Sequence, residues 1–289
     1  MRKVLLVLLI IASQLLAQEW KVDPTWLHRY LPNAGQQNTD FTTNGCHYRP
    51  VFGEGDKETH VLKNVVRFGE VEVDPHGTCR PVSYERQEEL YFVLEGKGIL
   101  KYATQKHPFG PHDFAYLPPR ESHAISNDSD EPVRIVAMNF KIPAEVTIGT
   151  PASPLSVANL DMLKEQPVEG HPTSVLYKLL VGPRASGRNA INAAYIVTSL
   201  FWMDFAPGGT NFPHHHESGE EIYLILDGQG DIVAGGGMDG IEGRHSAKAG
   251  DAYYFRPNCT VGFYNQNQPG AKAHILAVRS RVVLPEDKE

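Results

Sequence analysis

Positive charge is scarce in this chain of 289 residues. Its 27 Lys and Arg residues are outnumbered by 34 Asp and Glu residues, so the formal net charge at pH 7 is −7. The sequence contains no basic run and no basic stripe with interleaved aromatic residues. Because an acidic surface repels phosphate groups, the composition argues against nucleic acid and anionic membranes as partners.

Long hydrophobic runs are also lacking. The apolar run over residues 4–12 is shorter than the roughly 20 residues that a bilayer-spanning helix needs. It follows Arg2 and Lys3 and precedes a short segment ending at Ala17, so residues 1–17 resemble a secretory signal peptide. An uncleaved membrane anchor is the alternative. Cleavage after Ala17 predicts a periplasmic or secreted protein that is not attached to the membrane.

Cysteine is rare, with only Cys46, Cys79 and Cys259. An odd number of cysteines in a chain that is expected to meet an oxidising compartment allows one disulfide. Cys46 with Cys79 is the pairing to test, because Cys259 lies in what is predicted below to be a separate domain. Three reduced, buried thiols are the alternative.

Long amphipathic helical patterns are nearly absent. Short apolar runs alternate instead with Gly, Pro and Asp turns, a pattern typical of β-strands. These runs cover residues 90–94, 114–117, 133–138, 222–226 and 275–278. The best helical candidate is 157–165, with Ser156 as its N-cap, inside a proline-rich connector. The sequence therefore predicts an all-β protein.

A group of potential metal ligands lies in residues 208–230, GGTNFPHHHESGEEIYLILDGQG. His214 and His216 are two residues apart, so on an extended chain both side chains lie on the same face. Glu221 begins an apolar strand, while His215 faces away. Two imidazoles and a carboxylate suit a divalent transition metal such as Mn, Fe, Co, Ni, Cu or Zn. An exposed polar loop is the alternative interpretation.

The spacing of this segment resembles the first motif of the cupin family. Five residues match that motif position by position: Gly208, His214, His216, Glu221 and Gly228. The resemblance implies a small β-barrel of the double-stranded β-helix, jelly-roll-like type, with a metal in its mouth.

The second motif of the family is only partly present. Gly250 and Asn265 fit it, but Val261 stands where the family has its fourth metal ligand, a histidine. The remaining two-histidine, one-carboxylate set resembles the site of non-haem iron oxygenases. His274 or Cys259 could replace the missing donor, although a surface position for His274 and simple packing for Cys259 are the ordinary explanations.

The chain also contains an internal repeat. Residues 89–98 align with 221–230, and residues 113–127 align with 251–265. With the resemblance, this repeat predicts two tandem cupin barrels, each large enough to bury its own core. The expected order is a signal peptide (1–17), an N-terminal extension (18–60), barrel 1 (61–145), a linker (146–192) and barrel 2 (193–285).

Barrel 1 lacks a different part of the family's ligand set from barrel 2. Glu89 and His123 stand at metal-ligand positions, while Val82 and Tyr84 replace the paired histidines. Two donors seldom hold a metal, so barrel 1 is predicted to be metal-free. Its Glu89 and His123 are expected to bond to each other or to a ligand.

Two functions are compatible with these residues. The first is a secreted bicupin metalloenzyme for a small organic substrate. A dioxygenase is the leading expectation, with isomerase or decarboxylase chemistry as the other choices, and Tyr223 is the candidate catalytic phenol unless it only packs in the core. The second is a non-catalytic extracytoplasmic binding protein for a sugar, an organic acid or a metal. The resemblance also implies that two copies of the chain pair as a homodimer.

Overall fold

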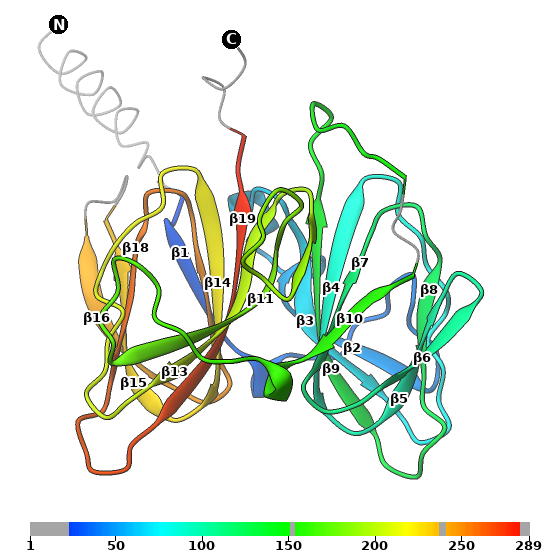
Figure 1. Ribbon diagram of the computed structural model, residues 1–289, viewed down its shortest axis with the longest axis horizontal. Coiled ribbons are helices and arrows are strands. Elements are labelled where there is room, and N and C mark those ends of the chain that lie inside the picture. The colour runs from blue at the N-terminus through cyan, green and yellow to red at the C-terminus, as the bar shows by residue number, and fades with distance from the viewer. Residues whose placement is uncertain (1–22, 151–153, 237–240, 284–289) are drawn as a thin grey trace, which may run out of the picture.

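A computed structural model of the protein describes residues 23–150, 154–236 and 241–283. Within these ranges the chain forms two β-barrels that lie side by side (Figure 1), which confirms the predicted all-β, two-barrel fold. The helices there are single 3₁₀ turns: η1 (Leu31–Asn33), η2 (Thr59–Val61) and η3 (Leu160–Met162). None of the described helices is long and apolar enough to cross a bilayer. The expected signal peptide lies outside the described residues.

Barrel 1 consists of a six-stranded and a three-stranded sheet. Its strands are β2 (Cys46–Gly53), β3 (Val65–Val73), β4 (Gln87–Glu95), β5 (Gly98–Tyr102), β6 (Gln105–Phe109), β7 (Asp113–Leu117), β8 (His123–Ser126), β9 (Val133–Lys141) and β10 (Ser156–Asn159). The larger sheet has the order β10-β7-β4-β9-β3-β2 and the smaller one β6-β5-β8.

Barrel 2 repeats this plan with a seven-stranded and a three-stranded sheet. Its strands are β1 (Trp26–Tyr30), β11 (Val175–Pro183), β12 (Ile191–Ala194), β13 (Val197–Phe205), β14 (Gly219–Asp227), β15 (Gln229–Gly235), β16 (Glu242–Lys248), β17 (Asp251–Phe255), β18 (Thr260–Asn265) and β19 (Ala273–Arg281). The orders are β1-β17-β14-β19-β13-β11-β12 and β16-β15-β18.

The strand that precedes each barrel along the chain completes a sheet of the other barrel. Strand β1 pairs antiparallel with β17 of barrel 2, and β10 pairs antiparallel with β7 of barrel 1. Figure 1 shows β1, in blue, among the late strands of barrel 2. Residues 18–60 and 146–192, considered above as an extension and a linker, thus contain strands of both barrels.

The helix predicted over residues 157–165 is wrong. Ser156 begins β10 instead of capping a helix, and only the single turn η3 follows, where the Asn159 side chain accepts a hydrogen bond from the Asp161 amide at 2.9 Å. The edge of β7 offers a full set of backbone partners, and this tertiary pairing outweighs a weak local helical pattern.

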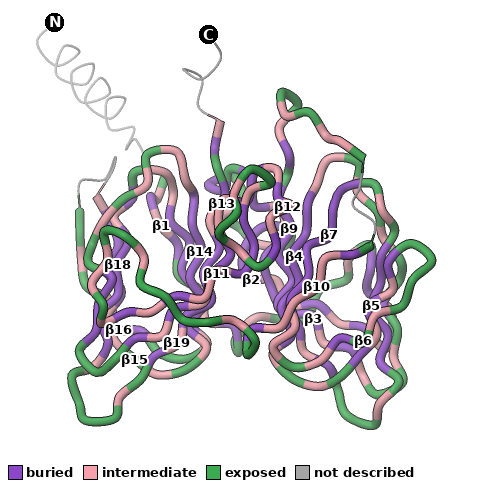
Figure 2. The backbone as a smooth tube through the Cα atoms, viewed as in Figure 1, coloured by how far each residue is buried: buried purple, intermediate pink, exposed green. Residues whose placement is uncertain are grey.

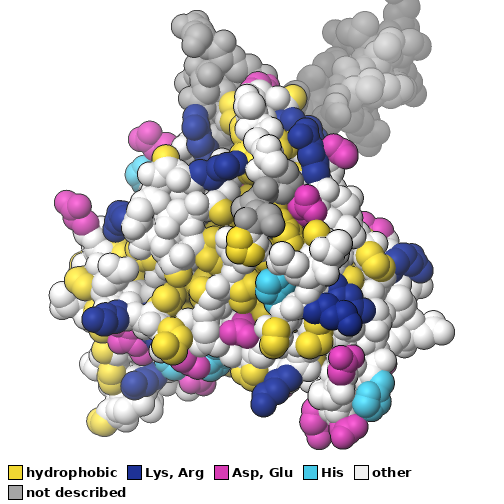
Figure 3. Space-filling model, turned by 45° about the vertical axis from the view of Figure 1, so that its right-hand side comes forward, with side chains coloured by type: hydrophobic (Ala, Val, Ile, Leu, Met, Phe, Trp, Pro, Cys, Tyr) yellow, Lys and Arg dark blue, Asp and Glu magenta, His cyan; other side chains and the backbone are white. Residues whose placement is uncertain are grey.

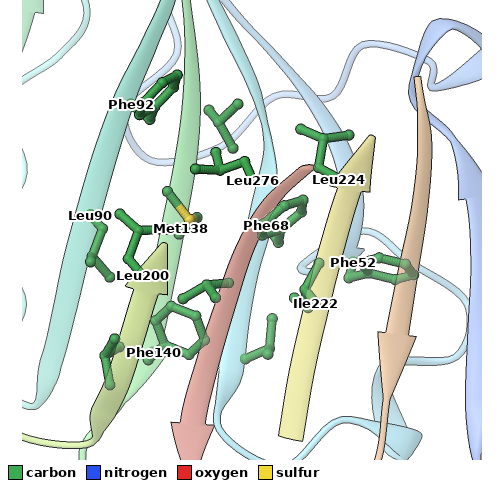
Figure 4. Close-up of a cluster of buried hydrophobic side chains, with 14 of the residues drawn as sticks. Phe52, Phe68, Leu90, Phe92, Met138, Phe140, Leu200, Ile222, Leu224 and Leu276 are labelled. Carbon is green, nitrogen blue, oxygen red and sulfur yellow. The ribbon is translucent and has the colours of Figure 1, made fainter. Parts of the chain in front are cut away.

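The two large sheets pack against each other, so their strands are buried on both faces. On β4, Tyr91 and Val93 point into barrel 1, whereas Leu90 and Phe92 join the cluster between the barrels. Figure 4 shows this shared cluster, in which Phe68 and Met138 of barrel 1 lie near Leu276 of barrel 2. Burial on both faces explains the continuous apolar runs of the sequence, and Figure 2 shows the buried chain concentrated in these strands.

Two buried glutamates connect the barrels across this contact. Glu220 of β14 accepts hydrogen bonds from the amides of Lys63 and Asn64 at 2.9 and 2.7 Å, just before β3 of barrel 1. In the reverse direction, Glu88 of β4 accepts bonds from the amides of Ile196 and Val197 at 2.9 and 2.7 Å. Each carboxylate therefore holds the turn that starts a strand of the other barrel.

Cys46 and Cys79 form a disulfide in barrel 1, with their α-carbons 5.0 Å apart. The structure thus favours the proposed pairing over three reduced thiols. Cys259 is buried in barrel 2, where its thiol donates to the carbonyl oxygen of Gly235 at 3.4 Å.

Candidate metal centre

The three predicted ligands come together in the mouth of barrel 2. His214 and His216 lie just before β14, Glu221 lies on β14, and their potential ligand atoms are all within 4.8 Å of one another. His215 is exposed, as its opposite facing predicts. The backbone holds this geometry in place, because His214 exchanges two hydrogen bonds with Val261, at 2.9 and 2.8 Å. The set is therefore suited in position to share one ion.

Glu221 shows most directly that a cation fits here. Only 2% of its surface is exposed, and neither carboxylate oxygen has a hydrogen-bond partner among the described residues. The nearest group is His216, whose Nε2 lies 3.2 Å from Oε2. A buried carboxylate without hydrogen-bond donors is costly, and a divalent metal ion would satisfy both of its oxygens.

The protonation states also suit a metal. Burial alone would raise the pKa of Glu221, but the adjacent imidazole of His216 and the charge of Arg279 outweigh it and lower that pKa. Burial is also the main reason that the pKa of His214 lies below its ordinary value. At neutral pH the site therefore offers a carboxylate and a neutral imidazole, the forms that bind metals.

His214 is oriented by its second ring nitrogen. Nδ1 lies 2.8 Å from the carbonyl oxygen of Phe212, and this contact favours the tautomer with the proton on Nδ1. Nε2 is then free of a proton and available to an ion, the arrangement commonly found for metal-bound histidines.

Arg279 of β19 belongs to the site, although the motif did not indicate it. Register places Arg279 directly opposite Glu221, and its Nη1 lies 2.7 Å from Nε2 of His216. No short-range pattern could have revealed this residue, since it lies 58 positions after Glu221 in the sequence. It brings to the site a permanent positive charge and a planar guanidinium whose N–H groups can bind an anion.

These residues line a small cavity of about 60 Å³. The rest of its wall consists of aromatic, aliphatic and polar side chains: Val168, His171, Tyr177, Leu179, Ser199, Phe201, Asn211 and Tyr223. The sequence indicated only Tyr223 among them. His171 and Tyr177 come from the region considered above as a linker, which carried no motif.

Two tyrosines differ in what their hydroxyl groups contact. The Tyr223 oxygen accepts a hydrogen bond from Asn211 Nδ2 at 3.0 Å, while the buried Tyr177 oxygen has no partner among the residues described. Burial raises the pKa of both phenols well above the ordinary value. Both therefore remain protonated and can donate a hydrogen bond into the cavity, and Tyr177 is the less engaged of the two.

Neither replacement considered for Val261 reaches the site. His274 lies on the face of β19 that points toward the other barrel, 3.5 Å from carboxylate oxygens of Asp204 and Asp227. Cys259 is turned to the backbone of Gly235. The ordinary explanations therefore hold: the alternation of β19 directs His274 away from the barrel interior, and the thiol of Cys259 has a backbone acceptor.

Comparisons with known proteins agree with this architecture. The family model for the cupin domain matches residues 69–139 and 201–278. This chain belongs to the cupin family. The two matches, one in each barrel, make it a bicupin and confirm the resemblance found in its motifs.

Solved structures resemble this bicupin over nearly its whole length. A putative glyoxylate-induced protein from Pseudomonas aeruginosa has a TM-score of 0.69 at 17% identity, covering 93% of this chain and 95% of that one. A deletion mutant of Bacillus subtilis oxalate decarboxylase has a TM-score of 0.64 at 11% identity, covering 94% and 81%. Such low identities show a shared fold alone.

A curated relative matches a shorter part of the bicupin. It is an uncharacterised protein of Methanocaldococcus jannaschii, 32% identical over 53 residues. The match covers 18% of this chain and 42% of that protein, so the chain spans less than half of this relative's length.

In the first barrel of the bicupin, the corresponding position holds ion pairs between side chains of the barrel itself. Nε2 of His123 lies 2.5 Å from Oε2 of Glu89, which confirms the predicted contact between these residues. The guanidinium of Arg67 lies 3.9 Å from the other Glu89 oxygen, and Tyr84 donates to Asp40 while accepting from Arg67. In barrel 1 the positive charge beside the buried glutamate thus comes from Arg67 and, when it is protonated, from His123.

Proposed function

We propose that this bicupin is a metal-dependent enzyme that converts a small organic acid at the site in barrel 2. The observation that carries the proposal is the buried Glu221 carboxylate, which faces two imidazoles and whose oxygens have no hydrogen-bond partner within the described part of the chain. His214, His216 and Glu221 would hold one divalent transition metal.

Arg279 supports an acidic substrate. Its guanidinium can bind a carboxylate through two parallel hydrogen bonds, and it lies within the same cavity as the metal ligands. A cavity of about 60 Å³ admits a molecule of only a few non-hydrogen atoms without rearrangement. The oxalate decarboxylases among the similar structures are named for a substrate of this size and charge.

The remaining side chains would orient and shield the substrate. Tyr177 and Tyr223 can donate hydrogen bonds to a substrate oxygen, while Phe201 and Leu179 exclude water. A metal held here would supply Lewis acidity or electron transfer. We favour a dioxygenase-like reaction, because a small set of protein ligands leaves coordination positions of the metal open for substrate and oxygen. Decarboxylation or isomerisation without oxygen is the alternative within the same site.

The proposal is tested by elemental analysis and by turnover. Purified protein is expected to contain about one divalent metal per chain, which the His214→Ala/His216→Ala variant loses and the His215→Ala control keeps. Oxygen uptake and product formation are then followed with oxalate, short 2-oxo acids, catechols and flavonols. We expect turnover of the short acids alone. Turnover without oxygen uptake would select the non-oxidative alternative, and no turnover in metal-loaded protein would contradict the proposal.

A non-catalytic binding protein is the second candidate, and Arg279 favours it. In barrel 1 Arg67 lies 3.9 Å from the buried glutamate, and in barrel 2 Arg279 could neutralise Glu221 in the same way. Metal-free protein that binds a short organic acid, and loses this binding in Arg279→Gln, would select this function.

We also propose a periplasmic or secreted location. The Cys46–Cys79 disulfide supports it, because such bonds persist mainly in oxidising compartments. Fractionation of expressing cells, with and without residues 1–17, tests this proposal. Recovery of the full-length product in the cytoplasmic fraction with reduced Cys46 and Cys79 would contradict it.

A further inference from the structure

The segment between η3 and β11 places a third histidine beside the candidate metal centre. Within it, the amide of His171 donates to the carbonyl oxygen of Val168 at 3.1 Å, and the amide of Val175 donates to Pro172 at 3.2 Å. Ser174 accepts a hydrogen bond from the amide of Thr210 at 3.3 Å. The first two bonds close turns within the loop, and the third joins the loop to the segment that leads to His214.

The ring of His171 lies next to the ring of a candidate ligand. Its centroid lies 5.0 Å from the centroid of His214, the same distance that separates His214 from His216. Nδ1 lies 2.9 Å from the carbonyl oxygen of Asn211, so Nε2 is the nitrogen left for another contact. The side chain is half-buried and lines the same cavity as the three ligands.

We infer that His171 is the fourth protein ligand of the metal in barrel 2, in place of the histidine that Val261 has displaced. The inference rests on the metal site of the proposed function. The arrangement of His171 repeats that of His214, since each has Nδ1 against a backbone carbonyl oxygen and Nε2 unassigned. The loop would then supply one imidazole of the metal site, and the motif would supply the other two.

The loop explains how a distant residue can serve this role. His171 is outside the group whose ligand atoms lie within 4.8 Å, so it must approach the ion by a short movement. A surface loop can make this adjustment, whereas a strand fixed on both sides cannot. The ring of His171 also lies 5.5 Å from the ring of Tyr177, measured between centroids. A movement of the loop would therefore also affect Tyr177 in the cavity wall.

The test measures metal affinity and coordination in the full-length protein. Mn²⁺, Co²⁺ and Zn²⁺ are titrated into the metal-stripped wild type, His171→Ala, the control His215→Ala, and His214→Ala/His216→Ala. We expect affinity to fall by at least about tenfold in His171→Ala and to stay unchanged in His215→Ala. X-ray absorption of the Zn²⁺ or Co²⁺ forms should show three imidazoles in the wild type and two in His171→Ala. Matching melting temperatures of the metal-free proteins establish that the variant folds.

The outcomes separate this inference from the proposed function. Wild-type protein that binds one metal through two imidazoles, with the same affinity in His171→Ala, overturns the role of His171 and leaves the metalloenzyme intact. Wild-type protein that binds no metal overturns both.

Discussion

A single buried glutamate occupies the same position in each barrel, but each barrel neutralises it in a different way. Across the large sheet of barrel 1, Arg67 pairs with Asn139, and Asn139 pairs with Glu89. The residues paired at the corresponding positions of barrel 2 are Ser199, Arg279 and Glu221. The arginine has thus moved by one strand between the repeats. Barrel 2 retains two imidazoles beside its carboxylate, whereas barrel 1 has one.

Arg279 allows a prediction at the residue scale. Arg279→Gln should raise KM for a short organic acid about ten- to a hundredfold, because a charged hydrogen bond contributes about 1.5–3 kcal/mol. Metal content should be retained, since Arg279 is not a ligand. Steady-state kinetics and elemental analysis check both expectations, with Arg279→Lys as the matched variant that keeps the charge but not the planar fork. An unchanged KM would remove Arg279 from substrate binding.

His123 sets a pH dependence in barrel 1. Burial by itself would lower its pKa, but the neighbouring Glu89 carboxylate raises it above the ordinary value of 6.5. A raised folded-state pKa stabilises the protein fully below pH 6.5, and this stabilisation is lost as pH rises through the folded-state value. The free energy of unfolding should therefore decrease above pH 6.5, by at most about 1.4 kcal/mol per pH unit.

Urea unfolding of metal-free protein between pH 6 and pH 9 measures this dependence. His123→Gln should flatten it, while His76→Gln, which changes an exposed histidine paired with exposed Asp130, should not. An equal slope in wild type and His123→Gln would disprove the assignment.

At the scale of elements, the Cys46–Cys79 disulfide ties the start of β2 to the segment after β3. It joins residues separated by 33 positions, and closing a loop of this length stabilises a fold by about 3–4 kcal/mol in the chain-entropy account. Cys46→Ser/Cys79→Ser should therefore lower the melting temperature of the protein by about 10 °C.

Differential scanning calorimetry checks this expectation, with Cys259→Ser as the matched cysteine change in the other barrel. The metal affinity of barrel 2 should remain as in the wild type. A melting temperature unchanged by the double substitution would show that the disulfide adds no stability.

At the scale of the whole molecule, neighbouring glutamates on one strand point in opposite directions and have different roles. Glu221 points into barrel 2, while Glu220 points to the other barrel and accepts from the amides that begin its strand β3. Glu89 and Glu88 repeat this division in barrel 1. On the face shown in Figure 3, acidic and basic side chains are interspersed around a central area of hydrophobic ones.

The interbarrel carboxylates give the last prediction. Glu88→Gln and Glu220→Gln should each lower the free energy of unfolding by about 2–4 kcal/mol, because a neutral amide leaves buried donors without an acceptor. Chemical denaturation measures the loss, and exposed Glu165→Gln is the control. Values within about 0.5 kcal/mol of the control would show that these carboxylates do not hold the barrels together.

The sequence by itself determined the two-barrel fold and the nearness of His214, His216 and Glu221. Turns between short apolar runs define the strands, and the internal repeat together with the cupin resemblance indicates two barrels. Residues two apart on a strand share a face, which places His214 beside His216, and the spacing of the motif adds Glu221. Only the tertiary structure decided the positions of Arg279 and His171, the opposed roles of Glu220 and Glu221, and the strand that replaced the predicted helix at Ser156. Strand register and the packing of one barrel on the other set these features, and both depend on contacts between residues far apart in the chain.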